Sequence, residues 1–267
     1  MILPGVHQAL KANGEIYYRS SITYGGKHIS LGSYSEELEA NQSYQLASEV
    51  LLRADKYIIE DYPSSCILSF HKWVVLINFR DNQIYFKNPI YLKKRYFVYY
   101  IDETNPLKFS AEDLFYYARH KIMRRGGYLF VSDYGMQIGI LSRYGIKNYA
   151  VAGKDYIFVN GDNTDFRYQN IEVINPYHGV SKIYVKNKPI YMTKIHINGD
   201  YMVGKYDSAT EAAIAYNKAA LLLNNCGLDK NFPENFIEGI DEIAYATIFQ
   251  KVSLAKKFRI YAESFRE

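Results

Sequence analysis

NGDYMVGKYDSATEAAIAYNKAALLL, residues 198–223, has a counterpart in the same chain, GGKHISLGSYSEELEANQSYQLASEVLL, which begins at Gly25. Identical residues coincide at one offset (204 − 32 = 172): Gly32 with Gly204, Tyr34 with Tyr206, Glu39 with Glu211, Ala40 with Ala212, Tyr44 with Tyr216, Ala47 with Ala219 and Leu51 with Leu223. GVH at Gly5 and GVS at Gly179 open the two copies at a similar offset (179 − 5 = 174). The pattern indicates an internal duplication. Copies so far apart are not neighbours in a solenoid, which predicts two small domains that bracket a third.

Each copy has the pattern of short strands followed by one helix. In the first copy, strands over residues 16–24 and 28–31 meet across Gly25-Gly26, a two-residue glycine turn that favours a tight hairpin. In the second copy, a strand over residues 190–197 precedes Asn198-Gly199, a strong hairpin signal. Ser208 and Thr210 can cap the helix that follows, whose small residues recur at helical spacing. The sequence therefore predicts, for each copy, a three-stranded sheet with a helix on one face and an uncovered second face.

The two copies, over residues 4–58 and 178–233, resemble the Apetala/ethylene-response-factor DNA-binding domain. The resemblance lies in the GV opening, the G-hydrophobic-hydrophobic-G-x-[YF] turn, the [ST]-x-E-x-A-x-x-A-Y-x-x-A-A helix, and Asn231-Phe232-Pro233 after the second helix. It is closer in the second copy. In that family the open face of the sheet lies in the major groove, where base edges can be distinguished. The resemblance therefore implies double-stranded DNA as the partner.

Strand alternation assigns the side chains to the two faces of each sheet. The side chains expected to point inward are Tyr18, Ser20, Ile22, Tyr191, Thr193 and Ile195, and those between them point outward. The residues expected to contact DNA, including those on the outer strands, are His7, Arg19, Ser21, Thr23, Lys27, His28, Ser181, Lys182, Met192, Lys194 and His196. The alternative is that they form an ordinary solvated strand face.

Charge argues for a DNA contact, while composition limits what it can read. Between Gly179 and Lys205 there are lysines at 182, 186, 188, 194 and 205 against one acid, Asp200, whereas the first helix is acidic. A positive sheet with an acidic helix behind it suits one face turned towards phosphate. Plant members of the family carry several arginines and tryptophans on this face. Here the single tryptophan, Trp73, lies outside both copies, which limits bidentate guanine readout to Arg19.

Bulk properties fit a soluble globular chain with two or three compact units. It has 267 residues, 48% of them hydrophobic and 22% charged, with a net charge of +4. No apolar run approaches membrane length, and residues 1–4 lack the start of a signal peptide. Cys66 and Cys226 can form at most one disulfide, so a reducing cytoplasm is the simpler expectation. We expect a cytoplasmic, DNA-associated location and no partnership with a membrane.

The middle of the chain contains NGDNTDFRYQNI, residues 160–171, which resembles the DGDxxNNRxxNL stretch of HNH nucleases. The similar subgroup is often joined to an Apetala-type domain in phage and bacterial homing endonucleases, which implies a bacterial or mobile-element source. The resemblance extends weakly over residues 90–175, where Leu141-Ser142-Arg143 takes the place of LHR and Gly126-Gly127-Tyr128 that of the GY strand.

HNH cleavage requires a histidine general base and a divalent metal held by histidine and oxygen ligands. In this register the paired histidines are replaced by Ile157 and Phe158, and the LHR histidine by Ser142. No histidine lies between His120 and His178. We therefore expect no catalytic residue, metal or cofactor. The vestigial motif comprises Asn160, Asp162, Asp165, Arg167 and Asn170. Its Asn and Asp residues could hold a hard cation, although loop-stabilising turn chemistry is the favoured interpretation.

Two further segments complete the prediction. Residues 66–100 contain KWVVLINF, QIYFKNPIYL and RYFVYYI, interpreted as strands that pack on the HNH-like fold, with Lys93-Lys94-Arg95 as an alternative phosphate-facing ridge. After Pro233, apolar residues predict one long helix, which either packs on the body of the protein or forms a homodimer.

The sequence thus predicts an α+β protein with four segments. These are a first Apetala-type domain over residues 1–60, a degenerate HNH-like domain over 61–177, a second Apetala-type domain over 178–233, and a C-terminal helix over 234–267. The expected function is non-enzymatic, sequence-preferring binding of double-stranded DNA by an inactive homing-endonuclease derivative that acts as a transcriptional regulator. The alternatives are a live HNH nuclease that has recruited His120 or the Asp162/Asp165 pair, and a protein-interaction module.

Overall fold

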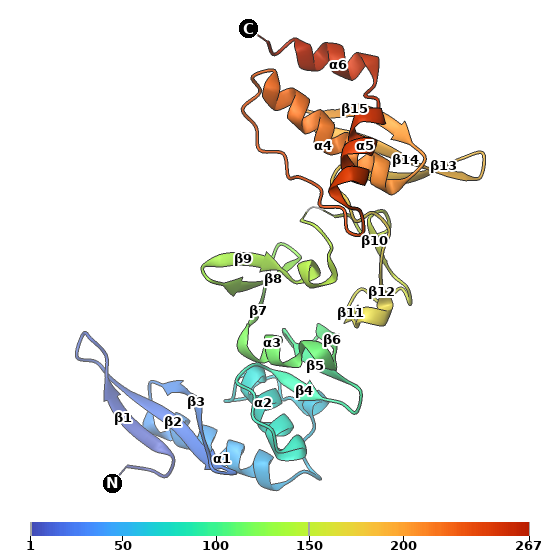
Figure 1. The fold of residues 1–267 in the computed structure, drawn as a ribbon. Helices are drawn as coiled ribbons and strands as arrows, with labels where there is room; N and C mark the ends of the chain where they lie inside the picture. The colour runs from blue at the N-terminus through green and yellow to red at the C-terminus, as the bar shows by residue number, and fades with distance from the viewer. Residues whose placement is uncertain (1, 149, 267) are drawn as a thin grey trace. The chain divides into compact units, whose positions relative to one another are not determined.

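The computed structural model describes residues 2–148 and 150–266, and it confirms the α+β class. The chain divides into two compact units (Figure 1). The first contains the residues up to Ile140 together with Asp162–Asn170, and the second contains Leu141–Gly161 together with the residues from Ile171 onward. These units do not follow the four predicted segments, because the middle segment is shared between them. Among the described helices, none has the length and apolar character needed to cross a membrane.

The first copy forms an antiparallel sheet of order β1-β2-β3 with one helix on it. The elements are β1 (Val6–Leu10), β2 (Ile16–Tyr24), β3 (Lys27–Tyr34) and α1 (Glu37–Leu52). Ile22, Ile29 and Leu31 point from the sheet into a core shared with Ala47 and Val50 of the helix. This is the arrangement predicted from the hairpin and helix patterns.

The second copy repeats this arrangement with β13 (Val180–Val185), β14 (Lys188–His196), β15 (Asp200–Tyr206) and α4 (Ala209–Asn225). The hydroxyl of Ser208 accepts a hydrogen bond from the Glu211 nitrogen at 3.1 Å, so the predicted cap forms. Four alanines of α4 are fully buried: Ala212, Ala213, Ala215 and Ala219. Their small side chains let the helix lie close to the sheet.

A glycine holds the entry to each sheet against the helix. Gly5 and Gly179 have φ values of +75° and +69°. A Cβ on Gly5 would lie 2.1 Å from the Tyr44 ring, and one on Gly179 would lie 2.5 Å from the Tyr216 ring. Both the backbone conformation and the close approach therefore require glycine. The duplication is visible in this packing as well as in the sequence.

Both sheets also carry a β-bulge at the same place. The register shifts between Ser20 and Ser21 in the first copy and between Thr193 and Lys194 in the second. The Ser21 nitrogen donates to the Gly5 carbonyl at 3.0 Å, and the Lys194 nitrogen donates to the Gly179 carbonyl at 2.8 Å. Each bulge is thus fixed by the glycine at the start of the first strand. Because the bulge inserts one extra residue in the third strand, the side chains beyond it point to the opposite face from the one that simple alternation predicts.

The segment KWVVLINF is a helix and not a strand, which corrects the sequence prediction. It lies in α2 (Phe70–Asn82), whose N-terminus is capped by Ser69. Eight consecutive residues from Trp73 to Arg80 are buried, so the segment shows neither a polar face nor strand alternation. Helix α2 packs in the same core as α1, where the Trp73 indole nitrogen donates to the Ile58 carbonyl at 3.0 Å.

The rest of the middle segment forms small sheets joined by short 3-10 turns. The first unit contains a sheet of order β11-β6-β5-β4, the helix α3, and a sheet of order β7-β8-β9, while the second contains the pair β10-β12. The bounds are β4 (Ile90–Leu92), β5 (Tyr96–Tyr100), β6 (Pro106–Ser110), α3 (Leu114–Arg119), β7 (Ile122–Arg125), β8 (Tyr128–Asp133), β9 (Met136–Gly139), β10 (Tyr156–Phe158), β11 (Asp165–Phe166) and β12 (Ile171–Val173). The predicted strands around residues 90–100 are therefore confirmed.

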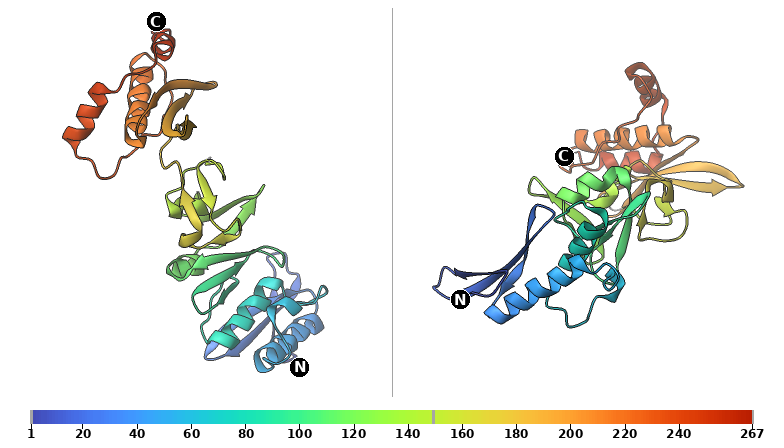
Figure 2. Two further views of the ribbon diagram at one scale, coloured as in Figure 1. Left: turned by 90° about the vertical axis from the view of Figure 1, so that its right-hand side faces the viewer. Right: turned by 90° about the horizontal axis from the view of Figure 1, so that it is seen from below.

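The C-terminal segment is two short helices and not one long helix, which is a second correction. These are α5 (Glu242–Lys251) and α6 (Lys256–Glu263), and α4 lies between α5 and the sheet (Figure 2). The Lys218 ammonium of α4 donates to the carbonyls of Phe249 and Val252 at 2.7 and 2.8 Å, where α5 ends. Val252 and Leu254, between the helices, are buried in the core of the second copy. Most of the apolar residues predicted for one helix therefore pack on the body of the protein.

The duplication supplies a matched test of one buried hydrogen bond. The Thr193 hydroxyl donates to the Ala212 carbonyl at 2.8 Å, whereas the buried hydroxyl of Ser20, at the equivalent position, has no hydrogen-bond partner among the described residues. We expect Thr193→Val to lower the free energy of unfolding by about 1 kcal/mol. Ser20→Ala should leave the free energy of unfolding unchanged or raise it, because it removes an unsatisfied buried group. Urea denaturation measures both variants, and an equal loss in the two would contradict this account.

Candidate nucleic-acid interface

The open faces of the two sheets carry most of the side chains that the sequence predicts to contact DNA. Paired residues on neighbouring antiparallel strands share a face. His7 pairs with Arg19, and Ser181 pairs with Met192, so these four lie on the open faces. Because Ser20, Ile22, Thr193 and Ile195 are buried beneath, the predicted inward set is confirmed at these positions.

The second copy presents a positive open face. Lys194 and Met192 of β14 are partly exposed, and His196 is exposed at the end of the strand. Lys205 of β15 is exposed and pairs with Met192, which places it on the same face. Sequence reasoning missed Lys205 as a site residue because simple alternation from the buried Val203 points it inward. The bulge, which places an extra residue in β15, turns it outward.

An acid, Asp200, lies at one end of this face, and the sequence analysis did not predict this placement. The Asp200 carboxylate is 2.9 Å from Nδ1 of His196, its partner across β14 and β15. This hydrogen bond lowers the pKa of the Asp200 carboxyl, and the positive charges of Lys194 and Lys154 act in the same direction. Asp200 therefore remains an anion at neutral pH, and it partly offsets the positive charge of the face.

The first copy presents a polar face with little charge. The Arg19 guanidinium donates to the hydroxyl of Tyr17 at 3.0 Å, and both side chains lie on the open face. Thr23 and His28 pair with each other and are exposed. Ser21 also faces outward but is only 8% exposed, which corrects its prediction as an accessible contact. Its short side chain lies in the central strand beside the bulge.

Two predicted contacts lie on the opposite faces of their sheets. Lys27 pairs with Tyr24, which points into the core, and its ammonium lies 5.2 Å from the centre of the Tyr85 ring. Lys182 pairs with Tyr191, on the helix side of the second sheet. Both predictions of open-face placement are therefore wrong. The resemblance places both residues on DNA-contacting outer strands, but they are adjacent to the outward residues His28 and Ser181, and adjacent residues of a strand point to opposite faces.

The stretch that resembles the HNH motif includes a loop held by ion pairs. Asp162 accepts hydrogen bonds from the Thr164 nitrogen and hydroxyl at 2.9 and 2.6 Å, and its carboxylate lies 2.9 Å from the Lys108 ammonium. The Thr164 hydroxyl and then Lys108 lower the pKa of Asp162 to about 2. With these contacts Asp162 stabilises the turn that follows it and holds the loop against β6 through Lys108.

The second aspartate of the motif is buried. Asp165 has no exposed surface and pairs with the Arg167 guanidinium through bonds of 2.8 and 2.6 Å. The Asn170 amide donates to the Asp165 carbonyl at 2.8 Å. The structure thus brings Asp162, Asp165, Arg167 and Asn170 into one loop in the first unit, whereas Asn160 is an exposed residue of the second.

The two residues in the register of the paired HNH histidines lie in a strand, and His120 lies at the end of α3. Ile157 and Phe158 lie in β10, paired with Glu172 and Ile171. The His120 ring donates from Nδ1 to the Tyr116 carbonyl at 2.9 Å, and its Nε2 lies 3.4 Å from Asp133. Over residues 2–148 and 150–266, no cluster of three His, Cys, Asp or Glu side chains could hold a metal ion.

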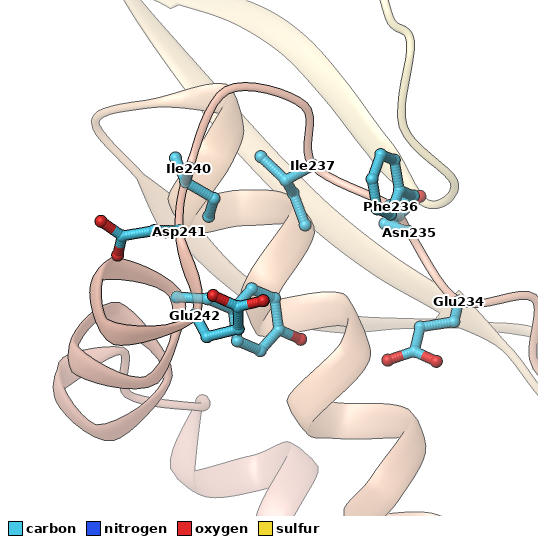
Figure 3. Close-up of a pocket in the computed structure, with 8 residues that line it drawn as sticks. Glu234, Asn235, Phe236, Ile237, Ile240, Asp241 and Glu242 are labelled. Atoms are coloured by element: carbon cyan, nitrogen blue, oxygen red, sulfur yellow. The ribbon is translucent and has the colours of Figure 1, made fainter.

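A pocket of different character lies on the second unit, beside α5 (Figure 3). Its apolar residues are Phe236, Ile237, Ile240 and Tyr245, and its acids are Glu234, Asp241 and Glu242. Phe236 is 81% exposed. The neighbouring Asn235 is buried, and it holds this segment by exchanging hydrogen bonds with Asn217 of α4. The carboxylates make the pocket unsuitable for a phosphate backbone.

Comparison with known proteins gives no relative that could assign these surfaces. No protein-family model, no curated protein and no solved structure matches the chain.

The hydrogen bonds of Asp162 with Thr164 and its ion pair with Lys108 predict a pH-dependent contribution to stability. The pKa of Asp162 is about 2 in the folded protein against about 3.9 in an unfolded chain. A lowered folded-state pKa means that the contribution is present above about pH 4 and is lost as the pH falls towards 2. We expect Asp162→Asn to be less stable than the parent at neutral pH, with a difference that shrinks in acid. Urea denaturation across this range measures it, with the exposed Asp229→Asn as control. A difference that stays constant down to pH 2 would contradict the ion-pair account.

Proposed function

We propose that the protein binds double-stranded DNA through the open face of the second sheet, with the first sheet as a weaker second contact. The observation that carries the proposal is the open face itself. It brings Lys194, Lys205 and His196 together on one side, and its one acid, Asp200, is paired with His196. Such a face can neutralise phosphates while side chains of a central strand reach base edges. The resemblance of both copies to the Apetala-type domain supports the same assignment.

The two faces suit different roles. Met192 and Lys194 of the second copy combine apolar contact with charge, whereas the first copy offers one guanidinium, Arg19, among serines, threonine and histidines. An arginine can pair with two acceptors of guanine, but a single cation neutralises little phosphate. The second copy therefore supplies most of the affinity. The first adds selectivity through the shared chain, as a second contact made at high effective concentration.

The proposal is for a binding protein without nuclease activity, acting as a regulator of transcription. The support is chemical. Ile157 and Phe158 cannot bind a metal or take a proton, Asp162 and Asp165 are paired with Lys108 and Arg167, and these ion pairs would have to break before either carboxylate could bind a cation.

A protein-interaction role is the second candidate, and the pocket beside α5 favours it. Phe236 is exposed there among three acids, which suits a partner segment that carries both apolar and basic residues. Homodimerisation through the C-terminal segment remains a narrower proposal. It rests on Ile243 of α5 and Ile260 of α6, which stay exposed although the rest of the apolar stripe is packed.

The decisive experiment is selection of bound sequences from a random duplex pool by the full chain, with magnesium, manganese or zinc present and the strands then examined for cuts. We expect enrichment of a composite site and intact strands. Reproducible cleavage that Asp162→Ala abolishes would establish the nuclease alternative. Failure to retain any duplex at low salt would overturn DNA binding and leave the acidic pocket as the better candidate site.

Two substitutions of opposite sign test the second sheet. We expect Lys194→Ala to weaken duplex binding about 5- to 100-fold, the effect of one lost base contact, or to reduce the salt slope by about 0.9 if it neutralises a phosphate. Asp200→Asn should strengthen binding severalfold, because it removes the acid from the same face. Lys251→Ala, at the exposed last residue of α5, is the control for a general loss of charge. Fluorescence anisotropy across a salt series measures all three. Unchanged affinity in the first two would exclude this sheet as the reading surface.

A further inference from the structure

The sheet β7-β8-β9 of the first unit lies in a basic stretch that the open faces of the two copies do not use. Residues 114–132 contain no aspartate or glutamate. Arg119 and Lys121 lie near one end of the β7–β8 hairpin, Arg124 and Arg125 lie at the other, and all four are exposed. Two acidic side chains lie nearby, each close to a basic side chain: Asp102 is 3.5 Å from Arg124, and Asp133 is 3.4 Å from His120. The surplus of positive charge suits a phosphate-bearing ligand.

One face of this sheet is aromatic as well as basic. Arg125 pairs with Tyr128, so both side chains lie on the face that also carries Phe130. The Tyr128 and Phe130 rings are nearly parallel, with planes 19° apart and centres 6.2 Å apart, and the Arg125 guanidinium lies 5.8 Å from the Phe130 centre. A Cβ on Gly139 would lie 2.2 Å from the Tyr128 hydroxyl. The missing side chain lets the tyrosine lie along the sheet, where it stays 46% exposed.

A second tyrosine, Tyr134, directly follows the other end of β8 and has an unfavourable backbone conformation. Tyr134 has φ +46° in the turn Tyr134-Gly135, and it is 96% exposed. Asparagine or glycine adopts this conformation more readily than an aromatic residue. The ring buries almost no surface in return, so Tyr134 adds little to folding. Contact with something outside the fold is a physical reason for an aromatic side chain at this position.

We propose that this face of the β7-β8-β9 sheet binds single-stranded nucleic acid, with Tyr128 and Tyr134 as stacking surfaces for bases and with Arg125, and Lys121 near the end of the hairpin, as contacts to the phosphates. An exposed ring can stack on a base only when that base is outside a duplex stack. The two tyrosines are six residues apart, one at the start of β8 and one in the turn after it. At roughly 3.3 Å per residue they are about 20 Å apart at most, which spans several nucleotides of a short binding site. The inference does not depend on the sheets of the two copies or on duplex reading.

The test is fluorescence anisotropy of the full chain with a labelled thymidine oligomer of about 12 nucleotides, within the known range of site sizes. We expect Tyr128→Leu, which keeps an apolar cover over Phe130, to weaken binding about 5- to 150-fold, and Tyr128→Phe to retain it. Tyr134→Asn is the sharper variant. Asparagine suits the positive φ, so thermal stability should hold or rise while affinity for the oligomer falls. Equal affinity in Tyr128→Leu, Tyr134→Asn and the parent would overturn the proposal.

Two controls separate stacking from simple attraction to charge. An abasic oligomer with the same number of phosphates should bind more weakly than the thymidine oligomer and be insensitive to Tyr128→Leu. Equal binding of both oligomers would reduce the surface to a phosphate patch and overturn the stacking assignment. Lys251→Ala, the control for a general loss of charge, should leave affinity for the thymidine oligomer unchanged. If Lys194→Ala leaves duplex binding unchanged while Tyr128→Leu still weakens oligomer binding, the proposed duplex function fails and this inference stands.

Discussion

The close approach of a glycine to a helical tyrosine organises each of the two copies. At Gly5 and Gly179 the chain enters the sheet with a positive φ and lies directly against the ring of Tyr44 or Tyr216. The carbonyl of the same glycine accepts a hydrogen bond from the backbone N–H of Ser21 or Lys194, the central-strand residue beside the bulge. One small residue thereby fixes the distance from helix to sheet and the position of the bulge. Any larger residue would meet both a strained backbone and an occupied space.

The bulge determines which side chains face outward. Because it inserts one residue in the third strand, Gly32 and Gly204 face the core, where a Cβ would lie 2.9 and 2.3 Å from the hydroxyls of Tyr34 and Tyr206. These hydroxyls donate to a carbonyl of the segment that follows each copy, Ile67 in one and Ser253 in the other. Equivalent tyrosines thus hold each copy to the segment that follows it in the chain, although these two segments differ. The open faces take no part in these hydrogen bonds, so the residues on them can differ between the copies without loss of this packing.

Much of the fold could be predicted from the sequence, because the duplication supplies each pattern twice. Hairpin turns, the Ser208 cap and the alanine stripe all lead to a sheet with one helix. The prediction failed where local pattern carries little information. A helix buried on all sides, such as α2, has no periodicity to distinguish it from a strand. The bulge is a tertiary feature, so Lys205 and Asp200 could be placed on the open face only from the pairing register. The burial of Ser21 likewise depends on neighbours that are distant in sequence.

In the loop of residues 162–170, two carboxylates are balanced by protein cations. Carboxylates beside a metal must stay ionised without a protein cation that competes for them. In this chain Lys108 and Arg167 occupy the positions opposite Asp162 and Asp165, so the negative charges are balanced within the loop. The Asp165 pair is buried, and removal of one partner from such a pair leaves an uncompensated charge that costs several kcal/mol. These paired residues therefore contribute to the stability of the loop. Their presence gives no support to catalysis, and balanced carboxylates also repel a phosphate backbone less than free ones.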